Sequence, residues 1–477
     1  MIFSSPFFLF VYFPVVLLLY YISPLKWRNL VLLVVNLVFY GWGEPVYVFI
    51  MFLSIAIDYT HGRLVTRCKA KGNDRGARAA VASSVVFNLL LLGFFKYWNF
   101  IAGSLAAVGA GFLPIIDRLP LPDGSSIPFT LPIGISFYTF QTMSYTIDVY
   151  RGDARTQKNI ITFGTFVTLF PQLIAGPIIK YKDLDEQLEE RTHSFEKFAS
   201  GVRRFVIGAC KKVLLANAIG PLWDVYLATP SEQLTTLGAW LGIVAFSLQL
   251  YFDFSGYSDM AIGLGRMLGF EFLENFNYPY LAKSASEFWR RWHISLGSWF
   301  REYLYFPLGG SRVGKGRLIL NLLIVWAATG IWHGASWNFL LWGLYWFVWI
   351  TLEKLWLDKW LSRAPAWLTH IYGVAIAIVG WAIFAVEDFS AMGPYLCAMF
   401  GFGAGALDSD FLYYFRNYLP ILVIAVVAAT PLAKTVWQKL PERARQVAFP
   451  VLMLAGLTLT TAYLVDGTYN PFLYFRF

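Results

Sequence analysis

The feature that most constrains this chain is a series of long apolar runs separated by clusters of basic residues. A helix needs about 20 apolar residues to cross a bilayer. Suitable runs lie at roughly 6–22, 29–42, 45–60, 80–112, 128–149, 205–227, 237–257, 318–332, 335–352, 369–386, 416–433 and 447–465. Charged residues make up only 14% of the chain, against about 25% in soluble domains. A soluble enzyme is excluded, and we expect an all-α polytopic integral membrane protein with about 11–12 transmembrane helices.

The basic clusters predict which loops face the cytoplasm, because Lys and Arg gather in cytoplasmic loops. Arg63–Arg78 and Lys180–Lys212 are rich in basic residues, whereas Glu387–Phe411 contains four acids and no base. If the basic loops lie inside, every predicted span alternates in direction and both termini lie outside. The formal net charge of +9 is then explained by topology, and no nucleic-acid partner is expected.

Two apolar segments, 160–178 and 258–282, begin and end between basic loops and therefore cannot cross the bilayer. The first contains Pro171 and the pair Gly176-Pro177, which break a helix. Irregular backbone at membrane depth is tolerated only where protein or a water-filled cavity covers it. We therefore predict re-entrant segments around a central funnel or tunnel. The whole chain, 1–477, is expected to form a single domain, with peripheral helices over about 1–112, a catalytic core over about 128–352 and C-terminal helices over about 369–477.

Two histidines stand out, because ionisable groups at membrane depth are costly and mark functional sites. His333 lies in G-I-W-H-G-A-S-W-N, where Gly330 and Gly334 permit close approach of another group, and His293 lies in E-F-W-R-R-W-H-I-S-L. His333 is either a structural histidine bonded to a carbonyl or a catalytic base. Apolar surroundings disfavour the imidazolium, and a neutral imidazole takes a proton from a hydroxyl that attacks an acyl carbonyl. No metal is expected, since no H-x-x-H or H-E-x-x-H spacing occurs.

Two intramembrane carboxylates, Asp253 and Asp259, flank the sequence F-S-G-Y-S. They are interpreted either as part of a hydrogen-bonded turn inside the bundle or as a polar lining for substrate. Trp332 and Asn338, in the same motif as His333, are further candidates for substrate contact. The remaining histidines, including His193, lie in or beside polar loops and are expected at the surface.

Three arginines, Arg290, Arg291 and Arg301, surround His293 on the side that the charge rule places in the cytoplasm. A guanidinium donates hydrogen bonds in pairs and suits the phosphates of an acyl carrier. The same side chains would also serve as anchors that bind anionic lipid at helix ends. Donor binding and lipid anchoring therefore both remain open for these residues.

Several long motifs occur in a fixed order: L-P-I-G-I-S-F-Y-T-F-Q, F-P-Q-L-I-A-G-P, Q-L-Y-F-D-F-S-G-Y-S-D-M, E-N-F-N-Y-P-Y, E-F-W-R-R-W-H-I-S-L and G-I-W-H-G-A. In these motifs, and along nearly its whole length, the sequence resembles the membrane-bound O-acyltransferase (MBOAT) family. The resemblance implies that family's fold and transfer of an acyl group from a cytoplasmic thioester to an acceptor on the outer face. It also implies that His333 corresponds to the family's invariant histidine and His293 to its second histidine, both catalytic.

The resemblance further implies a bacterial inner-membrane protein that binds no cofactor and uses acetyl-CoA or another acetyl thioester as donor. A separate periplasmic acetyltransferase protein is the expected partner, and an extracytoplasmic polysaccharide is the expected acceptor. Alginate is the expected polysaccharide, with peptidoglycan and cellulose as alternatives. A solute transporter is the competing class of function, and it is disfavoured because the sequence shows no inverted repeat.

Overall fold

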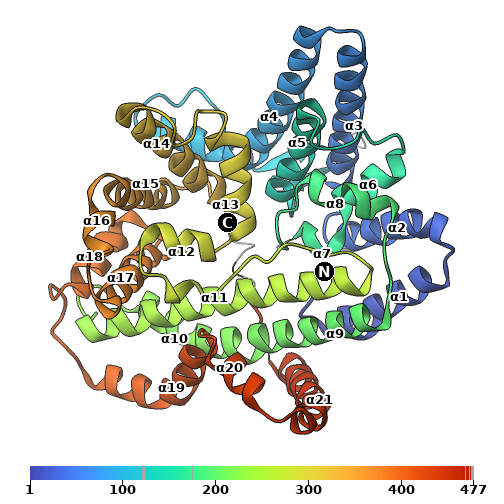
Figure 1. Ribbon diagram of the computed structural model, residues 1–477. Coiled ribbons are helices and arrows are strands. Elements are labelled where there is room, and N and C mark those ends of the chain that lie inside the picture. The colour runs from blue at the N-terminus through green and yellow to red at the C-terminus, as the bar shows by residue number, and fades with distance from the viewer. Residues whose placement is uncertain (121–124, 175, 468, 472, 474–477) are drawn as a thin grey trace. The chain divides into compact units, whose positions relative to one another are not determined.

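The computed structural model describes residues 1–477 except 121–124, 175, 468, 472 and 474–477. The described chain is mostly helical (Figure 1). It divides into two compact units. The first unit comprises Met1–Gly201 and Ala261–Leu273, and the second comprises Val202–Met260 and Glu274–Phe477. Helices α9 (Phe195–Cys210) and α11 (Thr236–Met267) contribute residues to both units.

The first unit consists of helices and one two-stranded antiparallel sheet. A π-helical turn, Phe8–Tyr12, leads into α1, and a 3₁₀ turn, Leu25–Trp27, leads into α2. The remaining elements are α1 (Phe13–Ile22), α2 (Arg28–Gly41), α3 (Val48–Ala70), α4 (Asp74–Ala107), β1 (Arg118–Pro120), β2 (Ser126–Pro128), α5 (Ile135–Arg151), α6 (Ile160–Thr168), α7 (Phe170–Leu173) and α8 (Tyr181–Glu189). In the sheet, Leu119 pairs with Ile127.

Helices α3 and α4 lie side by side as an antiparallel pair (Figure 1). The helix α4 begins where the side chain of Asn73 accepts a hydrogen bond from the Gly76 amide, which satisfies one of the free donors of the first turn. Between the two helices, the buried Asp58 carboxylate accepts hydrogen bonds from Ser84 and Asn88. Buried carboxylates require such partners, so this contact fixes the register of the pair.

The second unit is helical throughout its described part. Its elements are α10 (Asn217–Ala228), α12 (Ala285–Arg291), α13 (Ile294–Phe300), α14 (Lys315–His333), α15 (Trp337–Leu352), α16 (Asp358–Leu361), α17 (Ala366–Ala385), α18 (Phe389–Met399), α19 (Ser409–Ala428), α20 (Leu432–Lys439) and α21 (Glu442–Asp466). Shorter turns connect them: the π-helical segments Lys211–Ala216, Arg301–Tyr305 and Glu353–Leu357, and the 3₁₀ turn Pro279–Leu281.

Glycines allow two helix pairs of the second unit to pack backbone against backbone. A Cβ atom at Gly330 of α14 would lie 2.4 Å from the carbonyl oxygen of Phe339 on α15, and one at Gly343 would lie 2.4 Å from that of Trp326. Between α9 and α11, a Cβ atom at Gly208 would lie 2.5 Å from the Gly256 carbonyl oxygen. Small residues at helix interfaces are typical of membrane bundles.

Eight described helical segments are long and apolar enough to cross a membrane: Val48–Ala70, Asp74–Ala107, Phe195–Ala228, Thr236–Met267, Lys315–His333, Ala366–Ala385, Ser409–Ala428 and Glu442–Asp466. Each corresponds to a predicted span. The other four predicted spans also form helices, but these are shorter: Phe8–Ile22, α2, α5 and α15. The chain is a mostly helical, multi-pass membrane protein, as predicted.

Helix α11 continues without a break to Met267, so it is longer than the predicted span 237–257 and includes the first ten residues of the segment 258–282. The sequence F-S-G-Y-S is therefore helical and does not form a turn. Its acids are accommodated because basic side chains pair with them, as described below. The segment 160–178 does break as expected, since α6 and α7 are short and separated at Leu169. Residue 175 of this segment lies outside the described residues.

Candidate active site

His333 lies at the end of α14, where the chain leaves the helix through Gly334 in extended conformation. Its side chain is buried, with 5% of the residue exposed. Three aromatic rings surround the imidazole: the ring centroids of Trp342, Trp332 and Phe384 lie 4.9, 5.1 and 5.5 Å from that of His333. The sequence prediction of an apolar, Trp-rich setting for this histidine is confirmed.

His293 lies between α12 and α13, and its backbone has a φ of 45°. This left-handed conformation is unfavourable for any residue other than glycine, and such strain clusters at functional sites. The residue is completely buried, and its ring centroid lies 4.7 Å from that of Phe254 and 6.2 Å from that of Trp332. Both histidines therefore contact the same indole, that of Trp332.

The amide of Asn275 determines which nitrogen of His293 carries the proton. Asn275 Oδ1 lies 3.1 Å from the Ser295 backbone nitrogen and 3.1 Å from His293 Nδ1. A backbone N–H can only donate, so the atom facing it must be the amide oxygen, which only accepts. His293 Nδ1 must then be the donor. In the neutral imidazole, the other nitrogen, Nε2, consequently holds the lone pair.

The backbone around Asn275 explains why its side chain reaches His293. The Ile294 amide donates to the Asn275 carbonyl at 3.0 Å, and the Asn277 amide donates to the Arg291 carbonyl at 2.9 Å. The backbones of two motifs, E-N-F-N-Y-P-Y and E-F-W-R-R-W-H-I-S-L, are therefore hydrogen-bonded to each other. Burial lowers the pKa of His293 to about 3, so this imidazole is neutral at physiological pH.

The carboxylates Asp253 and Asp259 form buried ion pairs with the segment that follows α9. Lys212 Nζ lies 2.6 Å from the Asp253 carboxylate, and both side chains are almost fully buried. Asp253 also accepts a hydrogen bond from the Leu473 amide. Asp259 pairs with Lys211 at 2.7 Å. Of the two interpretations of these acids, the geometry favours a structural network over a substrate lining.

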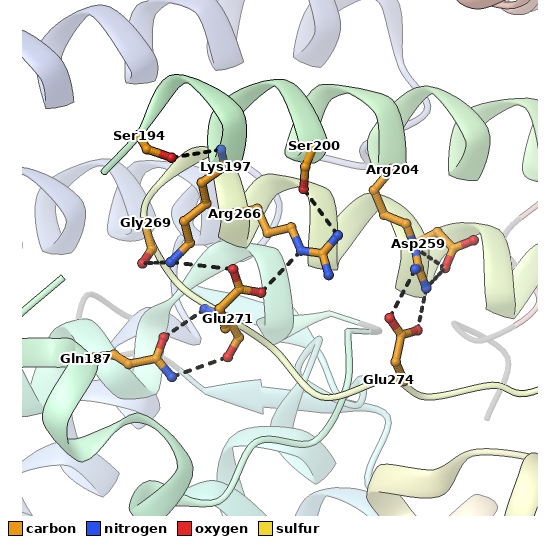
Figure 2. A network of polar contacts seen from close by, with 10 residues as sticks. All are labelled: Gln187, Ser194, Lys197, Ser200, Arg204, Asp259, Arg266, Gly269, Glu271 and Glu274. Atoms are coloured by element: carbon orange, nitrogen blue, oxygen red, sulfur yellow. Dashed lines mark hydrogen bonds and ion pairs between the residues drawn. The ribbon is translucent and has the colours of Figure 1, made fainter. Parts of the chain in front are cut away.

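Arg204 completes the network around Asp259, as Figure 2 shows. Its guanidinium lies 2.6 Å from the Asp259 carboxylate and also pairs with Glu274. Glu274 immediately precedes Asn275 in the chain. The ion pair therefore connects α9 and α11 to the segment that holds His293.

The three arginines around His293 differ in their surroundings. Arg291 pairs with Glu287, one helical turn earlier, at 2.8 Å and donates to the Asn277 carbonyl. It therefore stabilises α12 and the adjoining segment. Arg290 and Arg301 are exposed. Only these two present their charge to solvent, where a soluble donor would reach them.

The two remaining candidates lie close to His333. Trp332 contacts both histidines, as noted, and Asn338 donates through Nδ2 to the Phe384 carbonyl at 3.0 Å. Asn338 thereby holds the aromatic ring that contacts His333. Sequence reasoning missed Asn275, Phe254, Trp342 and Phe384. Among the described residues, no group of three or more His, Cys, Asp or Glu is arranged to hold a metal ion.

The fold and the site define a class of helical membrane protein in which two buried histidines contact the same indole. Residues 151–386 match the model of the MBOAT, membrane-bound O-acyltransferase family. The "Probable alginate O-acetylase AlgI" of Azotobacter vinelandii is 42% identical over 86% of this chain and 80% of its own length. That of Pseudomonas putida is 38% identical over the full length of both. The "Peptidoglycan O-acetyltransferase" of Helicobacter pylori is 29% identical over 85% of this chain and 81% of its own.

The chain therefore belongs to the membrane-bound O-acyltransferase family. The resemblance inferred from the motifs is confirmed, and so is the assignment of the chain as an acyltransferase.

Proposed function

We propose that this protein takes an acetyl group from a cytoplasmic thioester and delivers it for O-acetylation of a polysaccharide outside the inner membrane, with His333 as the general base. The observation that carries this proposal is the pair of buried histidines that contact Trp332. Buried imidazoles in an aromatic environment are kept neutral, which is the state that a base needs.

In the proposed step, an acceptor hydroxyl attacks the acetyl carbonyl as His333 takes its proton. An O–C bond forms, the C–S bond of the thioester breaks, and the proton passes to the departing thiolate, so charge and atoms balance. His293 supports this step through Nε2, whose lone pair accepts a hydrogen bond from a reacting O–H or S–H group. Asn275 holds His293 in the tautomer that allows it.

The charge rule supports the direction of transfer, because it places the basic loops and the exposed Arg290 and Arg301 on the cytoplasmic side. Their guanidinium groups suit the phosphates of coenzyme A or of an acyl carrier. On the outer side, a separate periplasmic acetyltransferase would pass the acetyl group to the polymer. Alginate is the proposed polymer, since relatives of about 40% identity are described as alginate O-acetylases and the peptidoglycan enzyme is more distant.

The test is the ester content of the exopolysaccharide in cells that carry His333→Ala or His293→Ala in place of the native protein. Loss of a general base slows the reaction by about 10²–10⁴-fold, so acetyl esters should disappear in His333→Ala. His370→Ala is the matched control, because this half-buried histidine lies on α17 and should leave acetylation unchanged. Normal acetylation in His333→Ala at equal protein level would refute the assignment.

The identity of the polymer needs a separate measurement. Acetyl esters should be lost from alginate in the deletion strain while those of peptidoglycan and cellulose persist. Loss of acetyl esters from peptidoglycan alone would support the proposed acetyl transfer but would identify peptidoglycan as the acceptor instead of alginate.

A further inference from the structure

Two arginines of the first unit, Arg28 and Arg191, pack against one buried tyrosine. The guanidinium carbons lie 4.9 and 5.8 Å from the ring centroid of Tyr20, which is fully buried. Arg28 is the first residue of α2, and Arg191 lies between α8 and α9. Both arginine side chains are half-buried, so their charges are accessible and only partly screened by water.

Each guanidinium is held in place by neutral partners. Arg28 Nε donates to the Ser23 carbonyl at 3.3 Å, and Arg191 Nη1 donates to Asn29 Oδ1 at 2.8 Å. Arg191 also lies over the ring of Phe270, with its guanidinium carbon 4.5 Å from the centroid. Both cations therefore lie against the same ring, and the charge of Arg28 acts on that of Arg191.

Within the described residues, neither arginine has a carboxylate within ion-pair distance. The other cations of this region do: Figure 2 shows that Lys197 and Arg266 both pair with Glu271, at 3.5 and 3.2 Å. Glu271 is therefore already occupied by two other cations. The positive charge of Arg28 and Arg191 is not balanced by an acid of the described chain.

His193 does not balance it either. Tyr20 Oη donates to the Leu268 carbonyl at 2.7 Å, so its oxygen must accept from His193 Nε2 at 2.9 Å. His193 Nδ1 then holds the lone pair. Arg28 Nη1 lies 3.1 Å from Nε2 and 3.3 Å from Nδ1, and of these two nitrogens only Nδ1 can accept its proton. The imidazole is consequently neutral, in agreement with burial and the charges of Arg28, Arg191 and Lys197, which lower its pKa to about 4. The sequence-based expectation of a simple surface histidine thus becomes a positioning role for Arg28.

We propose that Arg28 and Arg191 form a binding site for a phosphate group. A guanidinium presents a planar fork that matches phosphate oxygens, and the N-terminus of α2 adds a favourable partial charge at Arg28. The charge rule places this side of the chain at the cytoplasmic surface of the membrane, where anionic lipid headgroups lie. An anionic phospholipid and a soluble phosphate compound share this chemistry. The site shares no residue with the histidine site and does not depend on the proposed transfer reaction.

The experiment measures binding of three probes to the purified full-length protein in neutral detergent: phosphatidylglycerol, inorganic phosphate and coenzyme A. At least one probe should bind and raise the thermal unfolding midpoint. The double variant Arg28→Gln/Arg191→Gln should weaken that binding by at least about tenfold, since two charge-assisted hydrogen-bonding groups are removed. Preference for phosphatidylglycerol identifies a lipid site, and preference for phosphate or coenzyme A identifies a soluble ligand.

The double variant Lys71→Gln/Arg75→Gln is the control, because it removes the same charge from two exposed residues of another basic loop. It should bind the probe like the wild-type protein. Arg28→Lys/Arg191→Lys keeps the positive charges but removes the planar guanidinium groups, so the probe should bind with intermediate affinity. This variant keeps the test informative if the glutamine variant folds poorly. The proposal is overturned if no probe binds, or if the lysine variant and the control weaken binding equally.

Discussion

The second unit contains two buried polar regions of opposite character. In the first, around α9 and α11, Lys212 pairs with Asp253, and Asp259 pairs with Lys211 and Arg204. In the second, His293 and His333 are surrounded by aromatic rings, and the bond that fixes the His293 tautomer comes from the neutral Asn275. One region keeps its charges by pairing them, and in the other the His293 imidazole is uncharged because burial lowers its pKa to about 3.

This difference predicts which substitutions change the stability of the protein and which change the rate of acetyl transfer. A paired buried charge is fixed in its ionised state and cannot easily exchange a proton, whereas a neutral imidazole can accept one. Substitutions in the ion-pair region should therefore change folding, and those in the histidine region should change the rate and its pH dependence. The following predictions test that separation, beginning with the largest effect.

Asp253→Ala should reduce the free energy of unfolding by about 3–5 kcal/mol, because it leaves the buried ammonium of Lys212 without its partner. Thermal unfolding of the purified protein, together with the yield of folded protein in the membrane, measures this loss. Lys212→Met/Asp253→Leu replaces the pair by apolar side chains and should recover most of the stability. Equal losses in the single and double variants would show that the ion pair is not what matters at this position.

Asn275→Asp should change the pH dependence of acetyl transfer. A carboxylate at this position would favour the imidazolium and raise the pKa of His293 from about 3 toward neutral pH. In the proposed step Nε2 of His293 accepts a hydrogen bond and must be unprotonated, so activity should fall as the pH decreases through the raised pKa and recover at higher pH. The rate of the wild-type protein should show no such decrease near neutral pH.

Asn275→Ala is the matched comparison for that variant, because it removes the hydrogen bond without adding charge. It should lower the rate at every pH and leave the shape of the profile unchanged. The same profile in both variants would show that Asn275 acts only through folding.

Arg290→Ala and Arg291→Ala should separate donor contact from helix stability. The exposed Arg290 should affect the apparent KM for the thioester, and we expect an increase of about 5- to 50-fold if a charge-assisted bond to phosphate is lost. Arg291 pairs with Glu287, so its replacement should lower stability by about 1 kcal/mol or less, with KM unchanged. Steady-state kinetics at several thioester concentrations distinguishes the two.

Hydropathy predicted the spans because burial in lipid is decided by local composition, and α4, α14, α17, α19 and α21 overlap most of their expected ranges. The end of α11 at Met267 was not predicted. The acid Asp259 is accommodated inside this helix by Lys211 and Arg204, which come from a segment about fifty residues earlier and which hydropathy does not take into account.

The two histidines were identified from sequence because ionisable groups stand out in apolar surroundings. Asn275 was not, because an asparagine in a polar motif carries no such signal. Its contact with His293 arises from backbone pairing of two segments, and neither helical nor strand periodicity predicts that pairing. The pairing of Arg291 with Glu287, by contrast, follows from their spacing of one helical turn.

The left-handed backbone conformation of His293 is unfavourable for the folded chain, although the proposed reaction uses the imidazole of this residue. At a φ of 45°, glycine is the residue that the main chain prefers. His293→Gly should relieve roughly 1–2 kcal/mol of conformational strain. It also removes a fully buried ring that packs against Phe254 and donates to Asn275 Oδ1, and losing buried contacts of this kind costs more than the strain returns. The variant should therefore be less stable than the native protein, and the packing of the imidazole is what holds this backbone in its strained conformation.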